Sequence, residues 1–320
     1  YGITASISSQ TGNAETENNN TLSLADELKS DTKIKGQLSS SSDVDYFKYT
    51  VLGSSSLELT FDLPTSSSLD YFDIQILNSS GTVLGGVDRG SDGTLIASVE
   101  TAGTYYVRIT DSSYYNSGQY GLTLTEQAYN SNYEREDNGY GAIGTLLASN
   151  AKMSGQLFSS SDVDHYYIKA TEAGTFSVNF DSPLSSSLDY FKVSLLDPDF
   201  TILSSMKTGK DGEITASFDQ VGNYWVRVEN ANYHSDANYG ITASISSQTG
   251  NVLLAFRNAA AELGVFGTST MTKAELISAI KTSNDNTIIS GIDITADNAA
   301  VAAAARIVAL TDTNGITHAS

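Results

Sequence analysis

The sequence has no cysteine among its 320 residues, three prolines and a single tryptophan. Without cysteine no disulfide can staple the fold, so any stabilisation beyond the core has to come from core size or a metal ion. No window reaches about 18 consecutive apolar residues, which excludes a membrane-spanning helix. No signal peptide is visible, and because the chain begins within a strand pattern, we expect such a signal upstream.

Basic residues are also scarce: 17 Lys and Arg stand against 37 Asp and Glu, for a formal net charge of -20. Nucleic acids and anionic membranes would repel such a chain, so neither is an expected partner. Clustered carboxylates attract divalent cations; the alternative is that the acidity only provides solubility. Abundant Ser, Asn, Thr, Gly and Tyr with little Lys resembles bacterial extracellular proteins, which predicts an extracellular or cell-surface location.

Catalytic patterns are missing as well. The three histidines, His165, His234 and His318, lie in unrelated contexts, and there is no H-E-x-x-H or G-x-S-x-G. An S-x-x-K pattern from Ser204 overlaps K-T-G at 207–209 in one predicted hairpin, whereas penicillin-binding enzymes take these motifs from separate elements. We therefore expect no enzyme activity in this chain.

What the sequence does contain is an internal repeat. Glu17 recurs 119 residues later as Glu136, the segment SSSLDYF recurs unchanged at the same offset, and no insertion separates the copies. Copy A is 14–132 and copy B is 133–251. Residues 1–13 equal the end of copy B at twice that offset, so we interpret them as the trailing strand of a preceding B-type repeat in an alternating array.

Each copy shows the alternation of β-strands. Leu57, Leu59 and Phe61 alternate with polar residues, which predicts strands with one buried face. Turn signals such as NSSG at 78–81 separate these segments. The predicted fold class is mainly β: two tandem jelly-roll-like β-sandwich domains followed by a small α-helical segment.

The tail, 252–320, has a helical pattern instead. We expect an amphipathic helix over 252–263, a second from a Thr272 and Glu275 capping box to about Lys281, and a third from Asp297 to about Leu310. The third helix with the following TDTNG resembles half of a dockerin-like calcium repeat, with Asp312 and Asn314 as the only candidate ligands. An ordinary alanine-rich helix and a turn is the alternative.

The repeated motifs resemble a known family. ENNNT (17–21), GQLSSSSDVDYFKYTV (36–51), then SLDYFDIQI, AGTYYVRI and YGLTLT follow the pattern of bacterial pre-peptidase C-terminal domains, and copy B matches with EDNG at 136–139. The resemblance implies jelly-roll-like sandwiches that are appended to secreted proteases and other exported proteins. The collagen-binding domains of clostridial collagenases belong to the same group.

The resemblance also implies calcium ligands near the start of each domain. Gly139 replaces Asn20, so copy B lacks one side-chain ligand, for which Asp137 or a backbone carbonyl would compensate. The matching positions are Glu15, Glu17, Asn19, Asn20, Asp43 and Asp45 in copy A, and Glu134, Glu136, Asn138, Asp162 and Asp164 in copy B.

A physical argument stands beside this resemblance. Calcium takes six to eight oxygen ligands, and two acidic clusters that recur together in both copies can converge on one ion. Without an ion, their mutual repulsion would cost stability. The alternative is that Glu15 and Glu17 are solvated linker residues and that Asp43 caps a turn.

A recognition surface is the other candidate site. Tyr106 and Arg108 share the outward face of one predicted strand, as do Trp225 and Arg227 in copy B. Exposed aromatic rings beside arginine are typical of recognition surfaces, and collagen-binding relatives are thought to use exposed tyrosines on such a face. Tyr114, Tyr115 and Tyr233 lie in a predicted loop that can join this surface. Alternatively, these rings cover a neighbouring strand or domain.

Two functions from different classes remain open. The first is a non-catalytic, calcium-stabilised structural or adhesive repeat of a large secreted or cell-surface bacterial protein, in contact with neighbouring repeats and with extracellular protein or polysaccharide. The second is a collagen- or polymer-binding appendage of a secreted hydrolase. Strand 1–8 can also pair with an exposed sheet edge of another chain in self-assembly.

Overall fold

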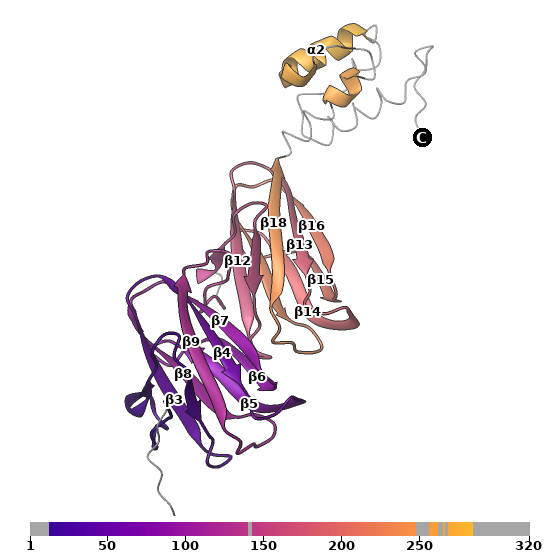
Figure 1. Cartoon of the computed structure of the whole chain (residues 1–320). Helices are drawn as coiled ribbons and strands as arrows, with labels where there is room; N and C mark the ends of the chain where they lie inside the picture. Colours follow the sequence, from indigo (N-terminus) through magenta and orange to yellow (C-terminus); the bar gives the residue numbers. More distant parts are fainter. Residues whose placement is uncertain (1–12, 140–142, 248–255, 262–264, 266–267, 284–320) are drawn as a thin grey trace, which may run out of the picture. The chain divides into compact units, whose positions relative to one another are not determined.

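The computed structural model describes residues 13–139, 143–247, 256–261, 265 and 268–283. In these ranges the chain is mainly β, and its strands form four sheets (Figure 1). The mainly-β fold with a small helical tail segment is therefore confirmed. The predicted strand at 1–8, the third tail helix and TDTNG lie outside the described residues. Within the described part of the chain, no helix is long and apolar enough to cross a membrane.

The first repeat forms one five-stranded and one four-stranded sheet. The five-stranded sheet has the order β1-β3-β8-β5-β6, with strands β1 (Asp26–Glu27), β3 (Val44–Val51), β5 (Ser67–Leu77), β6 (Val83–Gly90) and β8 (Gly103–Asp111). The four-stranded sheet has the order β2-β9-β4-β7, with strands β2 (Ile34–Gly36), β4 (Ser55–Asp62), β7 (Gly93–Val99) and β9 (Tyr120–Ala128). A short 3-10 helix, η1 (Leu22–Leu24), precedes β1, and β1 runs parallel to β3.

The second repeat has the same topology. Its five-stranded sheet has the order β10-β12-β17-β14-β15, with strands β10 (Thr145–Leu146), β12 (Val163–Ala170), β14 (Ser186–Leu196), β15 (Ile202–Gly209) and β17 (Gly222–Asn230). Its four-stranded sheet has the order β11-β18-β13-β16, with strands β11 (Lys152–Gly155), β13 (Gly174–Asp181), β16 (Gly212–Phe218) and β18 (Tyr239–Ser247). β10 again runs parallel to β12, so sequence repetition and topological repetition coincide.

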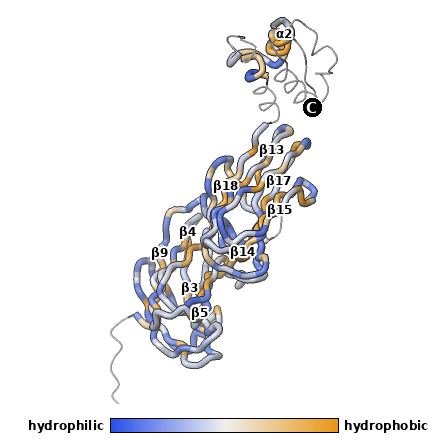
Figure 2. The backbone as a smooth tube through the Cα atoms, turned by 90° about the vertical axis from the view of Figure 1, so that its right-hand side faces the viewer, coloured by the Kyte–Doolittle hydropathy of each residue, from blue (hydrophilic) through white to orange (hydrophobic). Residues whose placement is uncertain are grey.

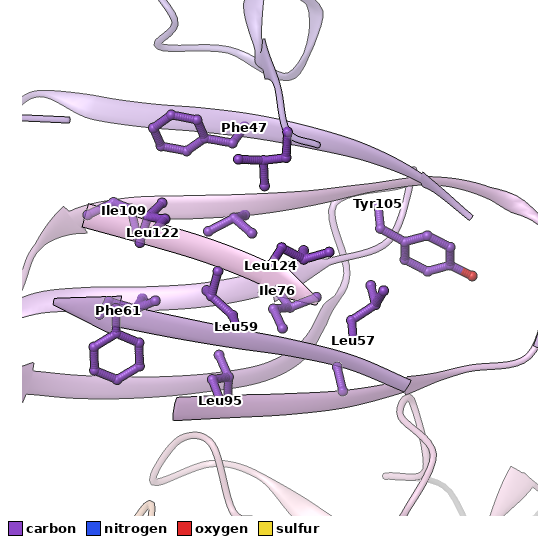
Figure 3. Packing of buried hydrophobic residues seen from close by; sticks show 14 of the residues in the cluster. Phe47, Leu57, Leu59, Phe61, Ile76, Leu95, Tyr105, Ile109, Leu122 and Leu124 are labelled. Atoms are coloured by element: carbon purple, nitrogen blue, oxygen red, sulfur yellow. The ribbon is translucent and has the colours of Figure 1, made fainter. Parts of the chain in front are cut away.

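The hydrophobic core of the first repeat lies between its two sheets. Leu57, Leu59 and Phe61 of β4 are buried, as the alternation along this strand predicts. Figure 3 shows their side chains together with Leu124 of β9 and Ile76 of β5, so both sheets contribute to the same layer. Each such fully buried side chain contributes about 1.5–3 kcal/mol through removal of apolar surface from water.

Hydrophobic residues follow the strands, whereas the connecting loops are largely hydrophilic (Figure 2). Polar and charged side chains are therefore concentrated at the ends of the strands and in the segments that lead into them. The acidic residues singled out in the sequence lie in such segments or at the first positions of a strand.

The tail has a small helical core of its own. Residues 256–261 are helical, followed by η3 (Thr268–Thr270) and α2 (Lys273–Ser283). The predicted capping box is confirmed: the Thr272 N–H donates to Glu275 Oε2 at 2.7 Å, and the Glu275 N–H donates to Thr272 Oγ1 at 3.3 Å. Buried side chains from both helices form this core: Phe256, Ala259, Ala260, Leu276 and Ile280.

Candidate metal centre

The acidic residues of the first repeat meet where the chain enters β3. Asp45 lies on the same face of β3 as core residue Phe47, and both are fully buried. The segment before β1 reaches this point because the Glu15 N–H donates to the carbonyl of Lys35 at 2.9 Å. As a result, Glu15, Glu17 and Asp45 each place a carboxylate oxygen within 4.8 Å of the other two.

The second repeat builds the same triad. Glu134, Glu136 and Asp164 meet the same distance criterion. Asp164 is fully buried and Glu134 almost so. The structure thus brings together six of the carboxylates that the sequence pointed to, as two triads of two glutamates and one aspartate. We call them triad A (Glu15, Glu17, Asp45) and triad B (Glu134, Glu136, Asp164).

Each triad, together with the asparagine of the same acidic segment, contains buried acceptor oxygens that have no hydrogen-bond donor. In the first repeat these are one oxygen of Asp45 and the side-chain oxygen of Asn19. In the second they are Asp164 Oδ1, Glu136 Oε1 and Asn138 Oδ1. A buried acceptor without a donor costs about 1–3 kcal/mol, and a charged one costs more. The cost disappears if these oxygens bind a cation.

Calcium fits this set of donors. It is bound by carboxylate and amide oxygens at about 2.3–2.6 Å, so two ligands of one ion lie at most about 5 Å apart. The 4.8 Å limit within each triad meets this condition. The residues that would hold the ion are triad A with Asn19, and triad B with Asn138. Water and backbone carbonyls commonly complete such a ligand set.

Buried tyrosines that were not among the predicted site residues hold the triads in place. In the first repeat the Tyr120 hydroxyl, on β9, donates to Asp45 and lies 3.2 Å from Glu15 Oε2. Tyr120 engages only one oxygen of Asp45; the other has no donor and shares a proton with the Glu15 carboxylate when one of the two groups is neutral, so an ion would take the place of that proton. The signal was present in the sequence, because Tyr120 recurs as Tyr239 at the repeat offset.

The second repeat uses two phenols instead of one. Tyr239 donates to Asp164 and Tyr166 donates to Glu134, while the two hydroxyls lie 2.7 Å apart. Phe47 occupies the position of Tyr166 in the first repeat and has no hydroxyl. Triad B is therefore the more enclosed and more rigidly hydrogen-bonded of the two.

Burial dominates the electrostatics of both triads. It raises the pKa of Asp45 to about 8, with the Tyr120 hydrogen bond opposing and Glu15 adding to the shift. It likewise raises the pKa of Glu134 to about 8, against the hydrogen bond from Tyr166. Burial, and then repulsion from Glu134, raises the pKa of Asp164 well above its usual range. Without a cation these groups resist ionisation, and a bound cation would remove that penalty.

Asp43 and Asp162 are placed differently from the triads. Asp43 Oδ2 accepts the Ser39 N–H at 2.6 Å and Asp43 Oδ1 accepts the Val44 N–H at 3.0 Å, so this side chain caps the turn before β3. Burial opposes ionisation of Asp43, but these hydrogen bonds, with one from Asn20, bring its pKa below the usual value. This geometry is the turn-capping alternative that the sequence left open.

Asp162 caps the matching turn in the second repeat. Its carboxylate accepts the N–H groups of Phe158 at 2.9 Å and Val163 at 2.8 Å. Burial exceeds the effect of these hydrogen bonds and raises the pKa of Asp162 to about 6. Gly139 leaves no partner equivalent to the Asn20 amide, which bonds Asp43 at 3.1 Å in the first repeat.

A glycine beside each triad leaves room for the phenols. A Cβ on Gly155 would lie 2.6 Å from the Tyr239 hydroxyl and would also meet the Tyr166 hydroxyl. In the first repeat a Cβ on Gly36 would meet Tyr120 and lie 2.6 Å from Glu15 Oε2. Gly36 is the last residue of β2 and Gly155 the last residue of β11. At both positions the tyrosine hydroxyl approaches the backbone so closely that a side chain would not fit.

Gly155→Ala is expected to destabilise the protein by about 1–3 kcal/mol, because the added methyl overpacks the phenol pair. It should also weaken calcium binding to the second repeat by about tenfold or more, since Tyr166 and Tyr239 position Glu134 and Asp164. Denaturant unfolding and calcium titration measure the two effects.

Gly103→Ala is the matched control, because a Cβ at Gly103 meets nothing within 4 Å. Equal stability and equal calcium affinity of the Gly155→Ala and Gly103→Ala variants would contradict this account of the glycine.

The predicted recognition surface is only partly exposed. Tyr106 and Arg108 face outward as expected but are half-buried, and Arg108 lies 3.4 Å from Asp73. The expected exposure of Trp225 is wrong: this side chain is only 7% exposed. Arg227 is half-buried and pairs with Glu229 at 3.3 Å.

The burial of Trp225 has a local cause. Phe200 replaces Gly81 of the first repeat, at a position that has positive φ in both. Its ring stacks on Trp225 at a centroid distance of 4.9 Å, and Tyr167 lies 5.3 Å away. The outward-facing rings of the second repeat therefore cover one another. For Trp225 this agrees with the alternative that the aromatic rings pack against neighbouring segments instead of forming a recognition surface.

No protein-family model matches the sequence, and no curated protein sequence matches it. Solved structures with some likeness include the CUB1-EGF-CUB2 domain of human MASP-1/3 (10% identity, 67% of this chain, 98% of that one, TM-score 0.23). Another is the M60 catalytic domain with the CBM51-1 and CBM51-2 domains of Clostridium perfringens ZmpB (7% identity, 63% of this chain, 33% of that one, TM-score 0.21). A third is the secreted serine protease VesC from Vibrio cholerae (10% identity, 69% of this chain, 48% of that one, TM-score 0.24).

The chain thus spans about a third of the ZmpB structure and about half of VesC. At these TM-scores the likenesses carry no argument about activity, ligands or partners.

Proposed function

We propose that this chain is a non-catalytic, calcium-stabilised repeat region of a secreted or cell-surface protein, with one ion in each β-sandwich. The observation that carries the proposal is the set of buried oxygens without donors at triad A and triad B, of which those of the aspartate and the asparagine lie at equivalent positions in both repeats. The resemblance to pre-peptidase C-terminal domains supports the same role.

The position of the triads explains what the ions would do. Glu134 and Glu136 lie at the start of copy B, directly after copy A ends at Asn132, whereas Asp164 belongs to β12. An ion bound by all three ties the connecting segment to the sandwich that follows. In an array of such repeats this shortens the free linker at each junction, which suits a structural or adhesive spacer.

Isothermal titration of the metal-free chain with calcium tests the proposal. We expect two bound ions for the wild type, one for Asp164→Asn, and none for the Asp45→Asn, Asp164→Asn double variant, because the carboxylate that is central to each triad is lost. Asp199→Asn removes an exposed aspartate of a turn outside both triads and should leave two ions. Equal binding by the wild type and the double variant, or no binding by the wild type, would overturn the proposal.

A further inference from the structure

Each repeat carries a pair of tyrosine rings on its surface, away from the triads in sequence. In the first repeat the rings of Tyr71 and Tyr114 have centroids 6.0 Å apart. In the second, Tyr190 and Tyr233 have centroids 5.4 Å apart. The members of the two pairs are related by the repeat offset of 119 residues. We call each pair a tyrosine platform, and we propose that the platforms bind a neutral polysaccharide.

The platforms are open to solvent. Tyr114 is 51% exposed and Tyr233 is 48% exposed, while Tyr71 and Tyr190 are half-buried. Contiguous exposed apolar surface is a feature of interaction sites, and the same pair of rings recurs in both repeats. Leucines two residues before Tyr71 and Tyr190 are also exposed, at 44% for Leu69 and 45% for Leu188.

Backbone hydrogen bonds hold each platform in one arrangement. The N–H groups of Ser113 and Tyr114 both donate to the carbonyl of Asp70 at 3.1 Å, and Asp70 directly precedes Tyr71. The second repeat reproduces this turn, with the N–H groups of Asn232 and Tyr233 donating to the carbonyl of Asp189. Because the loop is anchored to the strand, little conformational freedom remains to be lost when a ligand binds.

The surroundings of the platforms differ between the repeats in charge. Tyr115 is replaced by His234, and Asp88 is replaced by Lys207, whereas SSSLDY before each platform is identical. If the platforms bound a charged ligand, the charge beside the rings would be expected to have the same sign in both repeats, but it is negative at Asp88 and positive at Lys207. The net charge of -20 further disfavours a polyanion. These observations favour an uncharged ligand.

The chemistry of the rings favours a sugar. Among the described residues, the four platform hydroxyls have no hydrogen-bond partner, so they are free to bond sugar hydroxyls. The negative face of an aromatic ring attracts polarised C–H groups, and the axial C–H face of a pyranose presents such groups. The carboxylates of Asp70 and Asp189 add acceptors beside the rings. A polysaccharide repeats this combination along its length, so two platforms on one chain can bind it with avidity.

Retention of the full, calcium-saturated chain on insoluble cellulose and chitin, and its retardation in gels containing a soluble neutral β-glucan, test the inference. The Tyr114→Ala, Tyr233→Ala double variant should bind at least about tenfold more weakly than the wild type, and each single variant should lose most of the avidity. Tyr114→Phe with Tyr233→Phe separates the ring from the hydroxyl and should retain part of the binding. Tyr129→Ala, which removes an exposed tyrosine outside the platforms, should bind as the wild type.

Thermal unfolding of each variant checks that the fold is intact, which the exposure of the replaced rings leads us to expect. Unchanged binding by the double alanine variant would overturn the inference. So would a wild type that binds no neutral polysaccharide, or one that is retained only on alginate or on collagen fibres. The inference is independent of calcium occupancy at the triads, because the platforms contain none of the triad residues.

Discussion

Chelation of calcium should lower the midpoint of thermal unfolding of the wild-type chain by about 15 °C. An ion present at 1,000 times its dissociation constant stabilises the folded state by about 4 kcal/mol. For a domain of roughly 115 residues, each kcal/mol corresponds to about 4 °C. The expected effect is large because buried oxygens of Asp45, Asp164 and Glu136 have no donor to replace the ion.

Calorimetry or circular dichroism in EDTA and in calcium measures this shift. The Asp45→Asn, Asp164→Asn double variant should unfold within about 2 °C in the two buffers, since it lacks the central carboxylate of each triad. Asp199→Asn should keep the full wild-type shift. A wild type that unfolds at the same temperature with and without calcium would show that the triads do not hold a stabilising ion.

The pH dependence of stability should change sign when calcium is added. In the metal-free chain, Asp45 and Glu134 hold protons up to about pH 8 in the folded state, compared with ordinary values of 3.8 and 4.5. Between these limits the folded state binds more protons than the unfolded state, so the free energy of unfolding falls as the pH rises. This stabilisation is complete below the ordinary values and is lost as the pH passes about 8.

Calcium reverses the trend because it binds the ionised carboxylates and competes with their protons. A one-unit pKa difference corresponds to about 1.4 kcal/mol, so a carboxyl that keeps its proton from about pH 5 to about pH 8 in the folded state accounts for about 4 kcal/mol. We expect the metal-free midpoint to be about 15 °C higher at about pH 5 than at about pH 8. With saturating calcium the midpoint should be higher at about pH 8.

The groups that face these carboxylates define the control. Asp45 faces Glu15, Asp43 and the Tyr120 hydroxyl, and none of these supplies a positive charge. The Asp45→Asn, Glu134→Gln double variant lacks both of these carboxyls and should therefore lose much of the pH dependence in EDTA. A metal-free wild type that gains stability between about pH 5 and pH 8 would contradict the raised pKa values.

Much of the fold was predictable because it depends on local patterns. Alternation in segments such as Leu57 to Phe61 fixes which side chains face the core. The repeat of 119 residues required that both halves fold alike, and the two sets of sheets have the same strand order. The Thr272 and Glu275 capping box was also predictable from the sequence, because both of its hydrogen bonds form within one turn of helix.

The candidate site was predictable only in part. The sequence pointed to Glu15 and Asp45 because acidic residues recur together, but it did not separate Asp45 from Asp43. Strand alternation turns Asp45 inward, while Asp43 bonds the turn beside it. The tyrosine that reaches the site lies 75 residues from Asp45 along the chain, so only the pairing of sheets brings it there.

Trp225 is a residue whose direction was predictable from the sequence but whose exposure was not. Its outward direction follows from the alternation of β17, but its burial depends on Phe200, which arrives from a turn between β14 and β15. No pattern within a single strand reports which side chain of another segment will cover it. Exposure is a property of the folded neighbourhood rather than of the strand.

The sequence by itself determined the repeat, the inward and outward faces of the strands, the acidic character and the two groups of candidate ligands. Each of these depends on composition or on spacings of a few residues. The tertiary structure alone decided which carboxylates share a site, which tyrosines and glycines complete it, and which rings remain exposed. These depend on distances between residues far apart in the chain, such as Glu134 and Asp164 or Tyr71 and Tyr114, which are set only when strands pair and sheets pack.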